Sequence, residues 1–180
     1  MLRPLQSRRS WCRKSPVSPY GHIGHTHWVP LEKGLFVSSP EYALDQLIPH
    51  RSGMLLIDRL VSASLGEAIT EATPTRQWPL RQADYIGSLV AVELGAQTAG
   101  VLVGHQERKV KGAALHGKGW LVGIREAALH RQRFRIGTPI RTHARPGYHY
   151  KTFHEIETEI LVDRTLAAHI VLQVFWIETV

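Results

Sequence analysis

Glu93 is the only acidic or basic residue, histidine aside, in "SLVAVELGAQTAGVLVGH", which spans residues 88–105. In a helix, Gln97 and Gly100 would follow Glu93 at positions i+4 and i+7 and share its face. A carboxylate among apolar neighbours is costly unless it is paired, and proton-transfer sites often hold such a group. We therefore consider two roles for Glu93. It is either a proton donor and acceptor in catalysis, or a carboxylate held by buried backbone N–H groups or by an arginine.

The stretch 88–105 contains no proline and is apolar almost all round, which predicts a buried helix. Its small residues Gly95, Ala96, Ala99 and Gly100 include two glycines, each of which costs up to about 1 kcal/mol of helix stability. We expect these small residues to permit close approach by neighbouring backbone.

The sequence on both sides of this helix predicts strands. A short helix is expected at 40–47, with Ser39 as its N-cap, and a polar connection at 76–85. The predicted strands, rich in β-branched and apolar residues, lie at 54–63, 67–74, 119–129, 139–146, 150–162 and 165–177. The order indicates an α+β fold in which a long antiparallel sheet of five or six strands wraps around one central helix.

Length and composition predict one globular domain over residues 39–180, preceded by a poorly ordered basic leader over residues 1–38. No apolar run approaches the roughly 20 residues that span a bilayer. The net charge is +7, and much of the excess lies in the first 14 residues. Because no basic stripe alternates with stacking aromatic residues, we do not expect a nucleic-acid partner.

The cysteine and histidine residues bear on the expected cellular compartment and on metal binding. Cys12 is the only cysteine, so no intrachain disulfide can form, and no apolar segment typical of a secretory signal is present, which favours the cytoplasm. His22, His25 and His27 have a spacing that could bind a metal weakly, but no cysteine or carboxylate stands beside them. We expect no metal site.

Three motifs, in the same order, resemble those of the 3-hydroxyacyl-[acyl-carrier-protein] dehydratases of the hot-dog fold. They are "LIPHRSGMLLIDRLV" (47–61), "VELGAQTAGVL" (92–102) and "GIREAALHRQRFRIGTPI" (123–140). The likeness is greatest to a divergent branch associated with aryl-polyene-type clusters, which often lacks the usual histidine motif. The segment "RQWPLRQADYIGS" (76–88) likewise has no histidine where the ordinary family has Gly-His-Phe-Pro.

The resemblance implies dehydration of a 3-hydroxyacyl group carried on acyl carrier protein, with no cofactor beyond the carrier's own phosphopantetheine arm. It implies that Glu93 donates a proton to the leaving hydroxyl and that Gln97 orients Glu93. Backbone N–H groups at a helix start suit a developing oxyanion, so Gly87 and Ser88 become candidates to bind the thioester oxygen. The acyl chain would lie beside the central helix, near Gly100.

The base that removes the C2 proton is left open by the missing histidine. His50 is one candidate, although the residue that it matches in the family's opening motif is structural more than catalytic. His116, which precedes a predicted strand, is another. A partner subunit could also supply the base, because sites of this group form between two protomers. Either a homodimer or a heterodimer with another hot-dog dehydratase is therefore expected.

Two charged groups remain. Arg131, Arg133 and Arg135 alternate in a predicted turn, which we expect to lie next to Lys118 and Arg125. They could hold an acidic carrier protein or its phosphate, or form an ordinary solvated face. The neighbouring residues at 58 and 59, an aspartate and an arginine, match the family motif, and we expect them to form an inward-facing ion pair.

Two other functions fit the same residues. A hot-dog acyl thioesterase would use the helix carboxylate to activate water and would release a free acid. A non-catalytic subunit would only shape the tunnel of a partner enzyme.

Overall fold

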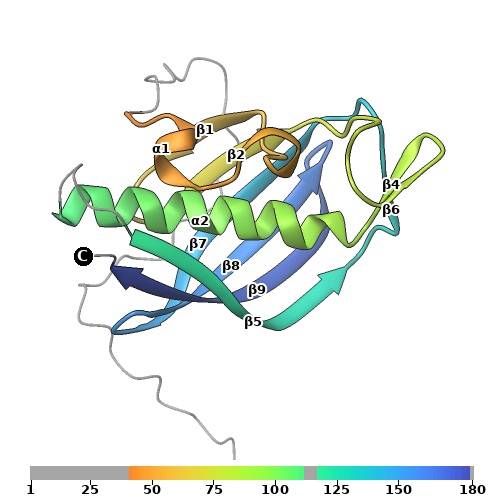
Figure 1. Cartoon of the computed structure of the whole chain (residues 1–180). Coiled ribbons are helices and arrows are strands. Elements are labelled where there is room, and N and C mark those ends of the chain that lie inside the picture. Colours follow the sequence, from red (N-terminus) through yellow and green to blue (C-terminus); the bar gives the residue numbers. More distant parts are fainter. Residues whose placement is uncertain (1–40, 112–116, 179–180) are drawn as a thin grey trace, which may run out of the picture. The chain divides into compact units, whose positions relative to one another are not determined.

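A computed structural model describes residues 41–111 and 117–178. Its main feature is a long helix, α2 (Val90–Lys111), packed against an antiparallel six-stranded sheet of order β1-β2-β7-β8-β9-β5 (Figure 1). The strands are β1 (Arg59–Ala63), β2 (Ala68–Ala72), β5 (Gly117–Leu129), β7 (Ile140–Tyr150), β8 (Phe153–Val162) and β9 (Thr165–Glu178). The expected α+β fold, one central helix on a long sheet, is confirmed.

The core lies between α2 and the inner face of the sheet. Leu94, Val101 and Leu102 of α2 are fully buried, as are Ile160 and Leu172 of β8 and β9. Alternate residues of each strand point toward α2, which explains why the predicted strands mix apolar and polar positions.

The glycines of α2 allow close contacts, but not as predicted: the neighbours of Gly95 and Gly100 are side chains, and backbone approaches at Gly104, which the prediction did not include. A Cβ atom at Gly104 would lie 2.5 Å from the carbonyl oxygen of Leu47, and one at Gly95 would lie 2.8 Å from Oγ1 of Thr158. α2 also continues six residues beyond the predicted end at His105, to Lys111.

The segment before β1 is less regular than predicted. The helix α1 (Leu44–Leu47) is shorter than the expected 40–47, and the proposed N-cap Ser39 lies outside the described residues. A 3₁₀ turn, η1 (Ser52–Met54), follows, so the predicted strand 54–63 pairs only from Arg59 onward.

A second sheet occupies segments predicted as a polar connection and a turn. It has three short strands, β3 (Arg81–Gln82), β4 (Tyr85–Gly87) and β6 (Arg133–Arg135), in the order β3-β4-β6. Ile86 and Phe134 are paired across β4 and β6 and are both buried. These two apolar residues explain why a segment rich in arginine forms a strand rather than a solvated turn.

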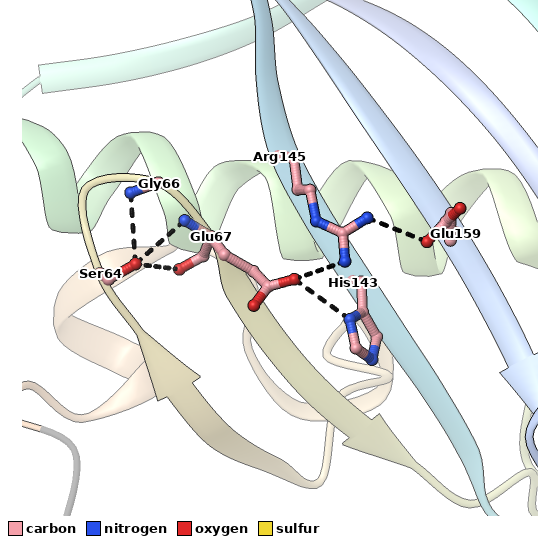
Figure 2. A network of polar contacts seen from close by, with 6 residues as sticks. All are labelled: Ser64, Gly66, Glu67, His143, Arg145 and Glu159. Carbon is pink, nitrogen blue, oxygen red and sulfur yellow. Dashed lines mark hydrogen bonds and ion pairs between the residues drawn. The ribbon is translucent and has the colours of Figure 1, made fainter. Parts of the chain in front are cut away.

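The outer face of the main sheet carries a network of charged side chains (Figure 2). The Glu67 carboxylate lies 3.2 Å from Nδ1 of His143 and 2.8 Å from the guanidinium of Arg145, which also contacts Glu159 at 3.1 Å. The network crosses the β7–β8 ladder and reaches the loop residue Glu67 just before β2, so it ties together segments that are distant in sequence.

Candidate active site

Glu93 lies in the first turn of α2, and Gln97 follows it on the same face. Nε2 of Gln97 donates hydrogen bonds to Oε1 of Glu93 (2.8 Å) and to the carbonyl oxygen of Met54 (2.7 Å). Oε1 of Gln97 accepts a hydrogen bond from the backbone N–H of Leu56 (3.0 Å). The fully buried Gln97 amide therefore holds the Glu93 carboxylate and fastens the 54–56 segment to α2.

His50 is next to Glu93 in the structure, with Nε2 3.5 Å from Oε1 of the carboxylate. The close approach of the chain to α2 brings it there: a Cβ atom at Gly100 would lie 3.0 Å from Cγ2 of Ile48. Nδ1 of His50 is buried and has no hydrogen-bond partner within the described part of the chain. The structure therefore places His50 at the carboxylate, and its role, structural or catalytic, stays a prediction.

The Glu93 side chain is 39% exposed and that of His50 is 30% exposed. The prediction of a helix buried on all faces is therefore wrong at this position, because one side of the first turn of α2 is open. Within the described residues, Oε2 of Glu93 has no hydrogen-bond partner, whereas Oε1 meets both Gln97 and His50. Oε2 is thus the carboxylate oxygen that can meet a substrate.

Gly87 and Ser88 do not offer free N–H groups. The N–H of Gly87 donates to the carbonyl oxygen of Leu80 (3.0 Å), and that of Ser88 donates to the carbonyl oxygen of Gln132 (3.1 Å). The small β3-β4-β6 sheet and its loops satisfy these two amides, which sequence spacing alone does not reveal.

The next two amides differ in this respect. The backbone bonds of the described residues include no acceptor for the N–H groups of Leu89 and Val90. Val90 precedes Glu93 by three residues, so the two lie on one face about 5–6 Å apart at Cβ.

The three arginines predicted in a turn lie on and beside β6. Arg133 pairs with Gly87 in the β4–β6 ladder and its Cζ lies 4.3 Å from the centre of the Tyr85 ring. Within the described residues, Arg131, Arg133 and Arg135 have no carboxylate partner. In contrast, the arginines at 59, 76, 125, 141 and 145 each contact one.

Lys118 and Arg125, which were expected next to these arginines, do not extend the basic group. Lys118 lies near the first residue of the 13-residue strand β5, whereas Arg131 follows its last residue, so the two are at opposite ends of the strand. Arg125 is engaged with Glu155, its NH1 2.7 Å from Oε2. The basic group is therefore smaller than predicted, but it adjoins the start of α2.

Asp58 and Arg59 do not form the expected inward-facing pair. Both are exposed: Asp58 accepts a hydrogen bond from the N–H of Thr73 (2.7 Å), and Arg59 contacts Glu71. Burial raises the pKa of Glu71, but hydrogen bonds from Arg141 and Arg59 outweigh it and hold that pKa below its usual value.

Several sequence candidates cannot be placed. His116, the histidines at 22, 25 and 27, and Cys12 lie outside the described residues. Over 41–111 and 117–178, no group of three or more His, Cys, Asp or Glu side chains is arranged to hold a metal ion. No helix in the same ranges has the length and apolar character needed to cross a membrane.

The geometry supports proton transfer rather than nucleophilic chemistry. An imidazole nitrogen and a carboxylate oxygen lie close together on an open face, and the carboxylate is oriented by a buried amide. Such a pair can remove one proton and deliver another at adjacent atoms of a small substrate. Sequence reasoning missed Arg51, whose side chain braces the segment that carries His50, although the Pro-His-Arg motif was a signal for it.

Comparison with known proteins bears on the family and the fold of the chain. The family model for ApeP-like proteins, described as ApeP dehydratase, matches residues 42–179. No curated protein matches the sequence.

Many solved structures are similar in fold, and three of them illustrate the range. The dehydratase heterocomplex ApeI:P from Xenorhabdus doucetiae contains a chain that is 23% identical, with a TM-score of 0.66, over 75% of this chain and 91% of that one. A homologue of HP0420 from Helicobacter felis is 14% identical, with a TM-score of 0.58 and coverage of 75% and 88%. Cj0977, a sigma28-regulated virulence protein from Campylobacter jejuni, is 10% identical, with a TM-score of 0.57 and coverage of 73% and 93%.

Proposed function

Because this chain belongs to the ApeP-like dehydratase family, we propose that it removes water from 3-hydroxyacyl thioesters on acyl carrier protein during synthesis of an aryl-polyene-type lipid. The observation that carries the proposal is the contact between His50 and Glu93, with Nε2 and Oε1 3.5 Å apart on the open face of α2. The pair offers a base and an acid within one chain, although the usual histidine motif is absent.

Elimination of water needs a proton removed from C2 and a proton delivered to the hydroxyl on C3. In our proposal, Nε2 of His50 takes the C2 proton, and the C–H electrons form an enolate at the thioester. The C3–O bond then breaks as the carboxyl group of Glu93 gives a proton from Oε2 to the leaving hydroxyl. The products are the enoyl thioester and water, and proton exchange with solvent resets both side chains.

The enolate needs donors at the thioester oxygen. The N–H groups of Leu89 and Val90 are the ones we assign to this role, in place of those of Gly87 and Ser88, which already have acceptors. The dipole at the start of α2 favours negative charge at the same point. Gln97 keeps Oε1 of Glu93 engaged and so leaves Oε2 for the substrate.

The three unpaired arginines support a carrier-bound substrate. They adjoin the start of α2 through the β4–β6 ladder and through the bond from Ser88 to Gln132. Unpaired guanidinium groups favour an acidic protein surface or a phosphate. We assign Arg131 and Arg133 to contact with the carrier protein near the entrance of the site.

The edge strand β5 supports assembly with a second hot-dog subunit. It pairs only with β9 among the described strands, and its Trp120, Leu121, Val122 and Ile124 side chains are between 46 and 58% exposed. An unpaired apolar edge of this length invites addition of another strand. The partner in our proposal is a different dehydratase subunit, as in the similar heterocomplex, and it would also cover the open side of Glu93.

The test incubates the assembled protein with 3-hydroxyacyl carrier protein and follows the acyl mass. Loss of one water that is abolished in Glu93→Gln and in His50→Asn supports the proposal. Release of free acid would identify a thioesterase instead. An assembled complex whose activity is the same with either variant would make this chain a non-catalytic subunit.

A further inference from the structure

The segment that carries His50 has little regular backbone bonding. α1 ends at Leu47, and Ile48, which precedes Pro49, is extended, with φ −131° and ψ 151°. The 3₁₀ turn η1 begins only at Ser52. His50 therefore sits in a short linker whose position must be fixed by side chains.

Arg51 supplies this fixation. Its NH1 donates to the carbonyl oxygens of Ile48 and His50, each at 2.7 Å, and its NH2 donates to the carbonyl oxygen of Asp45, also at 2.7 Å. The first and last of these bonds satisfy carbonyl groups at the end of α1, which no helical N–H can reach. The remaining bond holds the backbone of His50 itself.

We propose that Arg51 is a positioning residue: its guanidinium fixes the backbone of His50 so that Nε2 meets the Glu93 carboxylate. This inference rests on the proposed function. The fork geometry matters because a guanidinium presents several donors in fixed directions, whereas the ammonium of lysine is a compact charge on a flexible stem. Arg51 reaches its three acceptors from two nitrogen atoms, an arrangement that the single nitrogen of lysine does not reproduce.

Arg108 provides a matched control. Its Nε and NH2 donate to the carbonyl oxygen of Gln46, at 3.1 and 2.6 Å, so it too braces α1. The bonds shown for Arg108 within the described residues go to Gln46 and not to the carbonyl of His50. Replacing either arginine removes a brace from α1, but only replacement of Arg51 releases the His50 segment.

The experiment compares Arg51→Lys, Arg51→Ala and Arg108→Ala in the assembled protein, each also in a His50→Asn background. We expect Arg51→Ala to lower kcat by about 10- to 100-fold, because misplacement of a catalytic group by about 1 Å has effects of this size. KM should stay within about twofold, Arg51→Lys should recover only part of the rate, and Arg108→Ala should leave kcat near wild type.

In the His50→Asn background, Arg51→Ala should cause no further loss. An equal loss of kcat in both backgrounds, or equal losses in the two arginine variants, would overturn the proposal.

A second readout does not depend on turnover. Nitrogen NMR of the imidazoles should show the His50 signal change on Glu93→Gln in the wild-type background. The same substitution should leave that signal unchanged in Arg51→Ala, where the contact is lost. If the assembled wild-type protein removes no water, the proposed function fails, yet this NMR result still decides whether Arg51 positions His50. A His50 signal that responds to Glu93→Gln equally with and without Arg51 would refute the positioning role.

Discussion

Nε2 of His50 and Oε1 of Glu93 lie 3.5 Å apart, although one residue belongs to an irregular linker and the other to the first turn of α2. Two contacts make this meeting possible. Ile48 packs against the bare backbone of Gly100, and Gln97 binds the chain at Met54 and Leu56. The candidate active site is therefore a product of tertiary packing, and disturbing that packing should affect both stability and chemistry.

Gln97→Leu should destabilise the fold. The substitution leaves the buried N–H of Leu56 without its partner, and an unsatisfied buried group of this kind costs about 1–3 kcal/mol. It also removes the partly buried bond to the carbonyl oxygen of Met54. Denaturant unfolding measures the loss. Thr152→Val, in the turn between β7 and β8, is the control and should change stability by under about 0.5 kcal/mol. Equal stability of Gln97→Leu and wild type would contradict the anchoring role.

Gly104→Ala should also destabilise the fold, although alanine has a higher helix propensity than glycine. Alanine favours an exposed helix over glycine by about 1 kcal/mol, but its Cβ here would lie 2.5 Å from the backbone oxygen of Leu47. We expect a net loss of about 1–3 kcal/mol, as for other overpacked sites. Gly66→Ala, where a Cβ meets nothing within 4 Å, should be close to neutral in the same melting experiment. A more stable Gly104→Ala variant would show that α1 does not press on α2.

His105 should make the fold less stable in mild acid. It is buried beside Tyr42, and burial, followed by the charge of Lys109, lowers its pKa. The unfolded chain therefore binds the proton first, and stability falls as the pH drops through the ordinary histidine value of 6.5 toward the lowered pKa. Unfolding free energies at pH 8 and pH 5 should differ less in His105→Phe than in wild type. An unchanged pH dependence would rule out this residue as the source.

Glu71→Gln should lower stability at neutral pH by about 1 kcal/mol, because two arginines lose an ionised partner. The pKa of Glu71 is lowered, so its contribution is complete above the unfolded value and disappears as the pH falls through the folded one. Wild type and variant should therefore converge in strong acid. A stability difference that is as large at pH 2 as at pH 7 would show that the loss is not electrostatic.

Val122→Arg on β5 should weaken assembly with the partner subunit. A charge at the middle of an apolar edge strand opposes its pairing. Val110→Arg, at a position near the end of α2 that is more exposed than Val122 (74% against 58%), is the control and should leave the mass of the complex unchanged. Analytical ultracentrifugation compares the two. If the β5 variant assembles as tightly as the control, the interface lies elsewhere.

Local pattern predicted the fold well because its largest elements are strongly apolar. The strands β8 and β9 follow their predicted ranges closely, and Asp163 and Arg164 connect them. α2 and β7 begin near their predicted starts but continue six and four residues beyond their predicted ends. The small sheet escaped prediction because its strands have only two or three residues and pair across distant segments.

The site was predicted only in part. Glu93 and Gln97 are four residues apart on one helix, so their relation could be read from spacing. The approach of His50 depends on a path set by Ile48 and Arg51, and the acceptors of the Gly87 and Ser88 amides come from other loops. No local pattern encodes those contacts.

The most direct measurement of the central claim follows 3-hydroxyacyl carrier protein by mass spectrometry with the assembled protein and its Glu93→Gln variant. We expect the wild type to remove water and the variant to do so about 10²- to 10⁴-fold more slowly, the range for loss of a general acid or base. Equal rates of water loss in the two proteins would contradict the account.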